Sequence, residues 1–336
     1  MSEDPHTAHG GRIDLMRQAF PHAPQPWIDL STGINPHAYP HGPSTHAYDR
    51  VLPEQMLRTS CEAAMAARFG CAADACRAVP GTELVIRLLP YILRERRVAV
   101  RRPSYADHEH AWRSAGARLS LHDDPLEMAK ADDASIVVIV NPNNPDGRVC
   151  TRAEVAAAHA ALMERGGTLI VDEAYADLSP DISVAGRAGA PGLIILRSFG
   201  KTYGLPGLRL GSVLAEAKVL RRLDALLGHW AVSGAALRTG QQAYGDTGWL
   251  RRTAAQVRRE SDELRLVLNR AGLVDRGGTL LFRYVRADDA LAVWTQLAEK
   301  GIAVRRFDND PYHLRIGLPG DANALARLQA ALSPSV

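Results

Sequence analysis

The sequence predicts an α/β fold in which helices cover a mostly parallel sheet, with a smaller α+β domain after it. From about residue 53 to residue 215, short apolar runs typical of strands alternate with segments whose apolar residues recur at helical spacing. This alternation indicates parallel strands joined by helical crossovers. After residue 217, helical spacing continues to residue 271, and shorter strands and helices complete the chain.

The predicted elements define three regions. A helix over 53–69 is followed by strands and helices expected at 97–100, 105–115, 136–140, 151–165, 169–171, 193–196 and 212–215. Later segments are a strand at 280–285, a helix at 288–300, strands at 302–305 and 314–317, and a closing helix. The first fifty residues are rich in Pro, His and Gly, which favours an extended arm. We therefore assign residues 1–50 to an N-terminal arm joining the small domain, 51–230 to a large domain and 231–336 to the small C-terminal domain.

The composition argues against several classes of protein. The chain has 336 residues, enough for a large core, and its net charge of +3 gives no indication of a nucleic-acid partner. Neither the 4 cysteines nor the histidines of the first fifty residues have the spacing of a zinc site, so we expect no bound metal. No apolar run approaches the roughly 20 residues that span a bilayer. Because a signal segment is also lacking, we expect a cytoplasmic protein with no membrane partner.

Two short segments supply the residue types of a pyridoxal phosphate site. Lys201 lies in the run Ser198-Phe199-Gly200-Lys201, and Asp172 directly follows the apolar run Thr168-Leu169-Ile170-Val171. An enzyme of this kind needs a lysine to carry the cofactor and an anion that keeps the pyridine nitrogen protonated. Ligands of open α/β sheets bind beyond the carboxyl ends of the strands, so we expect Asp172 to face the ring from a buried position.

Lys201 could also belong to a nucleotide-binding site, because Gly200-Lys201-Thr202 matches the last three residues of the P-loop motif. The first glycine of such a loop should stand at position 195, where this chain has Ile195. Without that glycine the phosphate-cradling turn cannot be built, and we set nucleotide hydrolysis aside.

An ordered set of motifs resembles the class I/II aminotransferase family of fold type I pyridoxal phosphate enzymes. The motifs are Pro80-Gly81-Thr82-Glu83, Asn144-Pro145, Asp172-Glu173-Ala174-Tyr175, Ser198-Phe199-Gly200-Lys201 and Gly207-Leu208-Arg209-Leu210-Gly211. The resemblance covers most of the chain. It implies a central sheet with helices on both faces, pyridoxal 5'-phosphate as the cofactor, and a homodimer.

The resemblance implies a cofactor role for each matching residue. Gly81, Thr82 and Glu83 would open a helix whose free N–H groups hold the cofactor phosphate, although a plain helix start is the competing explanation. Ser198 and Arg209 would complete the phosphate site. The remaining cofactor residues are Tyr105 stacked on the ring, Asn144 and Tyr175 at the phenolic oxygen, and Tyr48 reaching the phosphate of a neighbouring subunit. Lys201 would carry the cofactor and act as general acid/base, with Asp172 and Tyr175 as its catalytic partners.

Within this family, the opening His9-Gly10-Gly11, the run Ser31-Thr32-Gly33 and the ending Leu314-Arg315-Ile316-Gly317 are similar to those of members that decarboxylate O-phospho-L-threonine for cobalamin biosynthesis. The resemblance implies that His9, Thr32, Asn144, Arg305 and Arg315 bind this substrate. Guanidinium groups suit carboxylate and phosphate equally, so residue type leaves the two anions unassigned.

Two other functions remain open from the sequence alone. The first is transamination of histidinol phosphate with the same cofactor, since the bond that breaks depends on substrate orientation. The second, more remote, is a module that binds the cofactor without catalysis.

Overall fold

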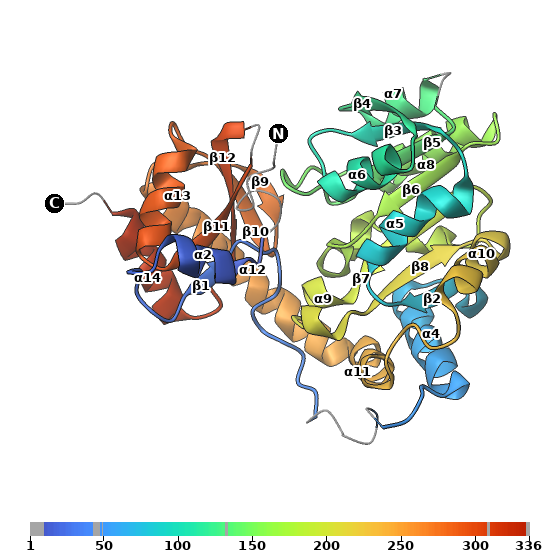
Figure 1. Ribbon diagram of the computed structural model, residues 1–336, viewed down its shortest axis with the longest axis horizontal. Helices are drawn as coiled ribbons and strands as arrows, with labels where there is room; N and C mark the ends of the chain where they lie inside the picture. Colours follow the sequence, from blue (N-terminus) through green and yellow to red (C-terminus); the bar gives the residue numbers. More distant parts are fainter. Residues whose placement is uncertain (1–9, 43–47, 49, 132–133, 308–309, 334–336) are drawn as a thin grey trace. The chain divides into compact units, whose positions relative to one another are not determined.

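The computed structural model describes residues 10–42, 48, 50–131, 134–307 and 310–333 (Figure 1). Contacts divide the chain into two compact units. The large unit contains Ala38–Asn144 and Arg148–Leu250, and the small unit contains Met1–His37, Pro145–Gly147 and Arg251–Val336. The sequence suggested breaks near 50 and 230 instead. Helix α12 (Thr247–Arg270) runs unbroken through the division at 250/251, so no turn or linker marks that point in the sequence.

The large unit is built on a seven-stranded sheet. The strand order is β2 (Cys76–Val79), β8 (Gly211–Ala215), β7 (Leu193–Ser198), β6 (Thr168–Asp172), β5 (Ile136–Val140), β3 (Arg97–Arg101) and β4 (Arg118–His122). The strands from β7 to β4 are parallel, whereas β8 runs antiparallel to both of its neighbours. The carboxyl ends of β5, β6 and β7 therefore meet at one edge of the sheet.

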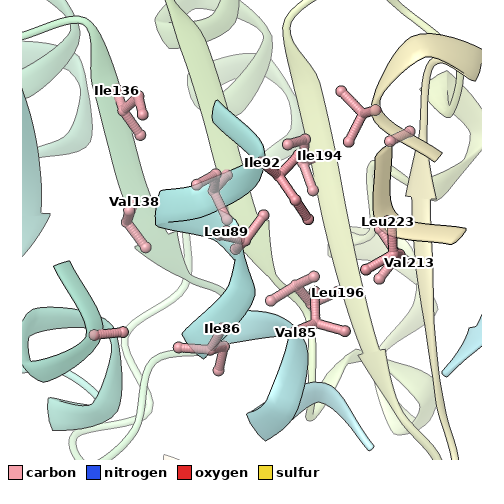
Figure 2. Close-up of a cluster of buried hydrophobic side chains, with 14 of the residues drawn as sticks. Val85, Ile86, Leu89, Ile92, Ile136, Val138, Ile194, Leu196, Val213 and Leu223 are labelled. Atoms are coloured by element: carbon pink, nitrogen blue, oxygen red, sulfur yellow. The ribbon is translucent and has the colours of Figure 1, made fainter. Parts of the chain in front are cut away.

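Helices cover both faces of this sheet. On one face, α5 (Thr82–Leu93), α6 (Ala106–Ser114) and α10 (Ala217–Leu227) share a core cluster with Ile136, Val138, Ile194 and Leu196 (Figure 2). The intervening residues of β5, Val137 and Ile139, are fully buried as well. Because successive strand residues point to opposite faces, the second face is also covered. Helix α7 (Pro125–Lys130) contacts β5, and α8 (Arg152–Met163) contacts β6.

Three further helices complete the frame of the large unit. Helices α4 (Gln55–Phe69) and α11 (Gly234–Gly245) pack on each other, and α4 also contacts β2. The single-turn α9 (Phe199–Thr202) follows β7 directly. Short 3₁₀ helices connect the elements, at Ala73–Ala75, Ala176–Leu178, Pro180–Ile182, Ala185–Arg187 and Pro206–Leu208.

The small unit has a five-stranded sheet of its own. The order is β1 (Ile28–Leu30), β11 (Ile302–Phe307), β12 (Asp310–Gly317), β10 (Phe282–Arg286) and β9 (Val274–Thr279), with β1 parallel to β11 and the other pairs antiparallel. The helices α2 (Ile13–Ala19), α13 (Ala290–Glu299) and α14 (Ala322–Leu332) belong to this unit, with most of α12. Across the described ranges, no helix combines the length and the hydropathy needed to cross a membrane.

Candidate active site

The catalytic candidates lie where β6 and β7 end. The two strands are parallel neighbours, with Asp172 opposite Leu196, so Ser198 at the end of β7 lies two residues beyond the level of Asp172. Helix α9 then carries Lys201, whose Nζ lies 5.8 Å from the ring centroid of Tyr175. Parallel pairing thus brings residues from two distant motifs to one edge of the sheet.

Gly200 allows the chain to fold tightly around Lys201. An ideal Cβ on Gly200 would lie 2.7 Å from Cα of Pro206, a separation that real side chains do not show. The segment that leads to Arg209 therefore packs directly against the turn that bears the lysine. This close approach explains why a glycine precedes Lys201.

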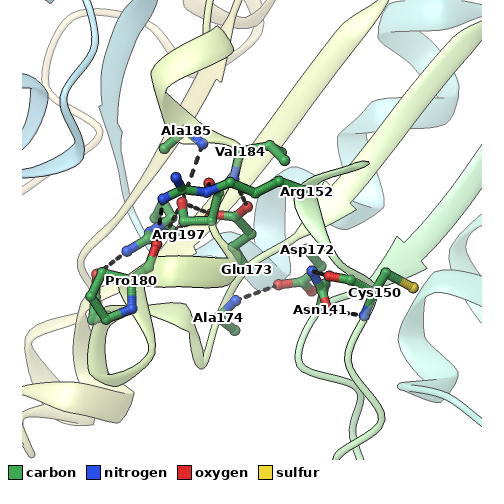
Figure 3. Close-up of polar contacts among 12 residues, drawn as sticks. Asn141, Cys150, Arg152, Asp172, Glu173, Ala174, Pro180, Val184, Ala185 and Arg197 are labelled. Atoms are coloured by element: carbon green, nitrogen blue, oxygen red, sulfur yellow. Dashed lines mark hydrogen bonds and ion pairs between the residues drawn. The ribbon is translucent and has the colours of Figure 1, made fainter. Parts of the chain in front are cut away.

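Asp172 is a buried and oriented carboxylate. The residue is 3% exposed, and one oxygen accepts a hydrogen bond of 3.0 Å from the backbone N–H of Ala174 (Figure 3). Its other oxygen lies 3.0 Å from Nε2 of His108 on α6. The two contacts fix the plane of the carboxylate, as an anion that faces a ring nitrogen requires.

Sequence reasoning missed His108. The residue is fully buried, and Nδ1 has no hydrogen-bond partner within the part of the chain that the structure describes. One signal was present in the sequence. His108 follows Tyr105 by three residues at the start of a predicted helix, so the two side chains occupy one helical face. Their rings lie 6.2 Å apart in the structure.

Tyr105 precedes α6 as its N-cap residue. Burial, and then the charge of Asp107, raises the pKa of Tyr105 above its ordinary value. The hydroxyl therefore stays neutral at physiological pH. A neutral, partly buried aromatic ring is the kind of surface on which a pyridine ring can stack.

The predicted phosphate site forms at the start of α5. Gly81 is the N-cap residue with φ +81°, and an ideal Cβ there would lie 2.8 Å from Nη2 of Arg209. The positive φ favours glycine at this position, and the missing side chain leaves room for the guanidinium beside the first turn, whose free N–H groups attract anions. The Glu83 carboxylate lies 3.7 Å from Nη2 of Arg209 and 3.4 Å from Nη2 of Arg87, so two cations offset its charge.

A buried ion network holds the two catalytic strand ends together. Nη1 of Arg197, next to Ser198, donates to the Glu173 carboxylate at 2.6 Å (Figure 3). Nη2 of Arg197 contacts the Asp177 carboxylate. Burial alone would lower the pKa of Arg197, but the charges of Asp177 and Glu173 raise it above the ordinary value. Since Glu173 adjoins Asp172, this network ties the chain at Asp172 to the chain before Lys201.

The loop before Asn144 is fixed by amide side chains. The side chain of Asn141 exchanges two hydrogen bonds of 2.9 Å with the backbone of Cys150 (Figure 3). The side chain of Asn143 accepts from Oγ of Ser104 at 2.7 Å and donates to the carbonyl of Pro103 at 2.8 Å. The loops that carry Asn144 and Tyr105 are therefore bonded to each other.

Three of the predicted substrate residues lie together in the small unit. Arg315 is 7% exposed, and its Nη2 donates to the carbonyl of Ser31 at 2.6 Å. Thr32 follows Ser31, and Arg305 pairs directly with Arg315 across β11 and β12, which places both guanidinium groups on one face. An ideal Cβ on Gly10 would lie 2.3 Å from the carbonyl oxygen of Ser31, so this glycine serves a close approach within the chain itself.

Two predicted residues remain. His9 lies outside the described residues. Tyr48 lies in the large unit against the start of α11, where its Cδ1 is 3.3 Å from an ideal Cβ on Gly234. Its predicted contact with a neighbouring subunit therefore stays a prediction.

Comparison with known proteins defines the class. Residues 50–332 match the family described as aminotransferase class I and II, and the chain belongs to this family. The chain is 40% identical over 326 residues to the threonine-phosphate decarboxylase of Pseudomonas aeruginosa, covering 96% of each chain. It is 27% identical to histidinol-phosphate aminotransferase 1 of Burkholderia pseudomallei, covering 94% of this chain and 96% of the relative.

A solved structure shows the same fold. The histidinol-phosphate aminotransferase of Sinorhizobium meliloti in complex with pyridoxal-5'-phosphate has a TM-score of 0.81 and 21% identity, covering 95% of this chain and 93% of that one. The predicted fold type I architecture, with its mostly parallel sheet and small α+β part, is confirmed.

The family uses pyridoxal phosphate, and the residues of this chain fit that cofactor. The cradle at Gly81 is the kind of site that a phosphate fills, because a glycine, a helix start and Arg209 converge there. Asp172 is a buried anion with a fixed orientation, and Lys201 lies at the same sheet edge. Phosphate, ring nitrogen and aldehyde of the cofactor thus each have a matching group.

Proposed function

We propose that this protein decarboxylates O-phospho-L-threonine to (R)-1-amino-2-propanol O-phosphate, the precursor of the aminopropanol linker of cobalamin. The observation that carries the proposal is the 40% identity to a threonine-phosphate decarboxylase across almost the whole of both chains. Identity to the histidinol-phosphate aminotransferase of similar coverage is 27%. The site described above supplies the groups that this reaction needs.

Bound pyridoxal phosphate supplies an electron sink that accepts the electron pair left when a bond at the substrate Cα breaks. Asp172 holds the positive charge of the ring nitrogen, and His108 holds Asp172 in place. Gly81, Thr82, Glu83, Ser198 and Arg209 bind the phosphate, with Glu83 contributing its backbone. Tyr105 packs on the ring, while Asn144 and Tyr175 bind the phenolic oxygen.

Lys201 binds the cofactor and then transfers a proton to the substrate. When the bond between Cα and the carboxylate breaks, CO₂ leaves, and Nζ of Lys201 delivers a proton to Cα. Which bond breaks depends on the group held perpendicular to the ring plane, and the residues that bind the rest of the substrate decide this. Arg315 binds the substrate carboxylate, and His9, Thr32, Asn144 and Arg305 bind the remaining polar groups.

We also propose that the active protein is a homodimer in which Tyr48 reaches the phosphate site of the second copy. The exposed apolar side chains of the large unit support a self-association surface, since Leu52 is 62% exposed and Met56 78%. The three residues between them, Pro53, Glu54 and Gln55, line one pocket together with Leu227 and His229. The segments that bear Met56 and Trp230 are thus neighbours.

An assay of CO₂ release tests the reaction. Purified protein with added pyridoxal phosphate should release one CO₂ per phosphothreonine consumed, without any keto acid present. Transfer of the amino group from histidinol phosphate to 2-oxoglutarate, with no CO₂ from phosphothreonine, would establish the aminotransferase instead. Tight cofactor binding with no turnover of either substrate would indicate a non-catalytic module.

A second experiment tests the role of Lys201. Borohydride reduction followed by peptide mass spectrometry should locate the cofactor on Lys201. Lys201→Ala should lose both this adduct and the visible absorbance of the bound cofactor. An unchanged spectrum in the variant would remove the central residue assignment.

A further inference from the structure

The loop that follows Asn144 rests on a pair of glycines in β9. An ideal Cβ on Gly147 would lie 2.0 Å from the carbonyl oxygen of Gly278, and one on Gly277 would lie 2.3 Å from the carbonyl oxygen of Asp146. Side chains do not approach backbone this closely, so neither position accepts a Cβ unless the two backbones separate. We call Gly147, Gly277 and Gly278 the glycine seat.

The residues that contact β9 belong to a short loop whose two ends are hydrogen-bonded to each other. Pro145–Gly147 belongs to the small unit, although the chain on either side belongs to the large unit. The backbone N–H of Asn143 donates to the carbonyl of Arg148 at 2.8 Å, which ties the two ends of the loop. In the sequence, Asn144 lies between Asn143, which makes this hydrogen bond, and Asp146 and Gly147, which contact β9. A shift of Asp146 or Gly147 is therefore transmitted to Asn144 through very few rotatable bonds.

The seat also lies in one row of the small sheet with the arginine candidates. Gly277 pairs with Tyr284, Tyr284 pairs with Arg315, and Arg315 pairs with Arg305. Directly opposed residues of antiparallel strands place their side chains on the same face. The carbonyl of Asp146 thus rests on the face of the sheet that presents the two guanidinium groups.

We propose that the glycine seat positions Asn144 for its contact with the phenolic oxygen of the cofactor, so that Gly147, Gly277 and Gly278 are positioning residues. The inference rests on the proposed function, which assigns that contact to Asn144. An amide that donates to an ionised oxygen favours the ionised form. Misplacing Asn144 therefore raises the pH at which the absorbance of the bound cofactor changes.

The test compares two glycines that share a backbone conformation but differ in contacts. Gly147 has φ +72° and Gly166 has φ +69°, and an ideal Cβ on Gly166 meets nothing within 4 Å. Gly147→Ala and Gly166→Ala therefore carry a similar backbone strain, and only the first disturbs the seat. Absorbance of each holoprotein is titrated with pH, and Asn144→Ala defines the full size of the shift.

We expect the midpoint of Gly147→Ala to move upward by at least half of the Asn144→Ala shift, with a parallel fall in kcat for phosphothreonine. Gly166→Ala should keep the wild-type midpoint. Gly277→Ala, which disturbs the contact from the side of β9, should behave as Gly147→Ala does.

The outcomes separate the inference from the proposed function. A shift in Asn144→Ala with none in either seat variant overturns the seat and leaves the function standing. Absence of any cofactor absorbance in the wild-type protein overturns the function itself. If both seat variants fail to fold while Gly166→Ala folds, the contact serves folding, and the positioning role is also overturned.

Discussion

Asp172 derives its chemistry from a neighbour that its own motif does not contain. His108 lies 64 positions away in the sequence, yet its Nε2 is 3.0 Å from the carboxylate. When a buried carboxylate loses a hydrogen-bond donor, its charge is less well compensated and its orientation is less firmly fixed. We therefore expect His108 to affect how well Asp172 keeps the ring nitrogen of the cofactor protonated.

Replacing His108 with phenylalanine keeps most of the ring volume and removes the donor. Hydrogen bonds to charged groups are worth about 1.5 to 3 kcal/mol, so we expect His108→Phe to lower kcat/KM about tenfold or more. Steady-state decarboxylation kinetics measure the change. His110→Phe, an exposed position on the same helix, is the matched control. Equal kinetics for the two variants would show that Asp172 does not depend on His108.

Arg315 shares one face of the small sheet with Arg305 and is the more buried of the two. Arg315→Ala should raise KM for phosphothreonine by about 100-fold, because it removes a charged anion contact, and should leave the affinity for pyridoxal phosphate unchanged. Substrate kinetics and a cofactor titration together measure this split. Weakened cofactor binding with unchanged KM would place Arg315 in the phosphate site instead.

At the level of single residues, local sequence patterns predicted where three of the candidates lie in the fold. Asp172 and Ser198 end strands whose apolar runs are visible in the sequence, and Lys201 follows Ser198 by three residues, so their shared sheet edge could be predicted. The contacts of Arg315 with Ser31 and of His108 with Asp172 could not, because each joins segments that only the tertiary fold brings together.

Among the elements, α8 has the best defined beginning. Oγ1 of Thr151 accepts from the N–H of Glu154, and the Glu154 carboxylate accepts from the N–H of Thr151 at 2.6 Å. The backbone hydrogen bond from Thr151 lowers the pKa of Glu154, and so does the bond of 2.8 Å that Oγ1 of Thr151 donates to the same carboxylate, which alanine at position 151 would remove. A lowered folded-state pKa gives stability that is present above the ordinary pKa of a carboxyl group and is lost as the pH falls.

Thr151→Ala should therefore destabilise the protein by about 1 kcal/mol at neutral pH without changing kcat. The difference from the wild-type protein should shrink as the pH falls below the ordinary pKa of a glutamate, about 4.3, and through the lowered pKa of Glu154. Urea unfolding at both pH values measures it. Thr59→Ala, at an exposed position within α4, should show no such pH dependence.

The sequence predicted the long elements better than the short ones. The helices α4, α8 and α13 and the strands β5, β6 and β7 have strong periodicity or long apolar runs. The strands β1, β2, β4 and β9 were not predicted. β1 has three residues and pairs with β11 from the far end of the chain, and β9 contains Gly277 and Gly278, which are poor strand formers. Pairing, and not local preference, makes these segments strands.

For the whole molecule, we expect self-association through an apolar patch of the large unit. The patch comprises Val51, Leu52, Met56, Leu226 and Trp230, each more than half exposed. Met56→Asp should shift the protein from dimer to monomer in sedimentation velocity, and cofactor affinity should fall with it because Tyr48 would no longer reach a second copy. Leu291→Asp, at an exposed apolar position in the small unit, should remain dimeric. A monomeric wild-type protein with full activity would contradict both parts.

The course of the chain has a consequence for any attempt to dissect the protein. The backbone passes from one compact unit to the other at 37/38, 144/145, 147/148 and 250/251. No single truncation therefore yields either unit intact, and a gene fragment that encodes residues 38–250 would still contain the three foreign residues that rest on β9. Neither half is a transferable module, and a single crossover between distant homologues at any of these four points would assemble the small unit from two parents.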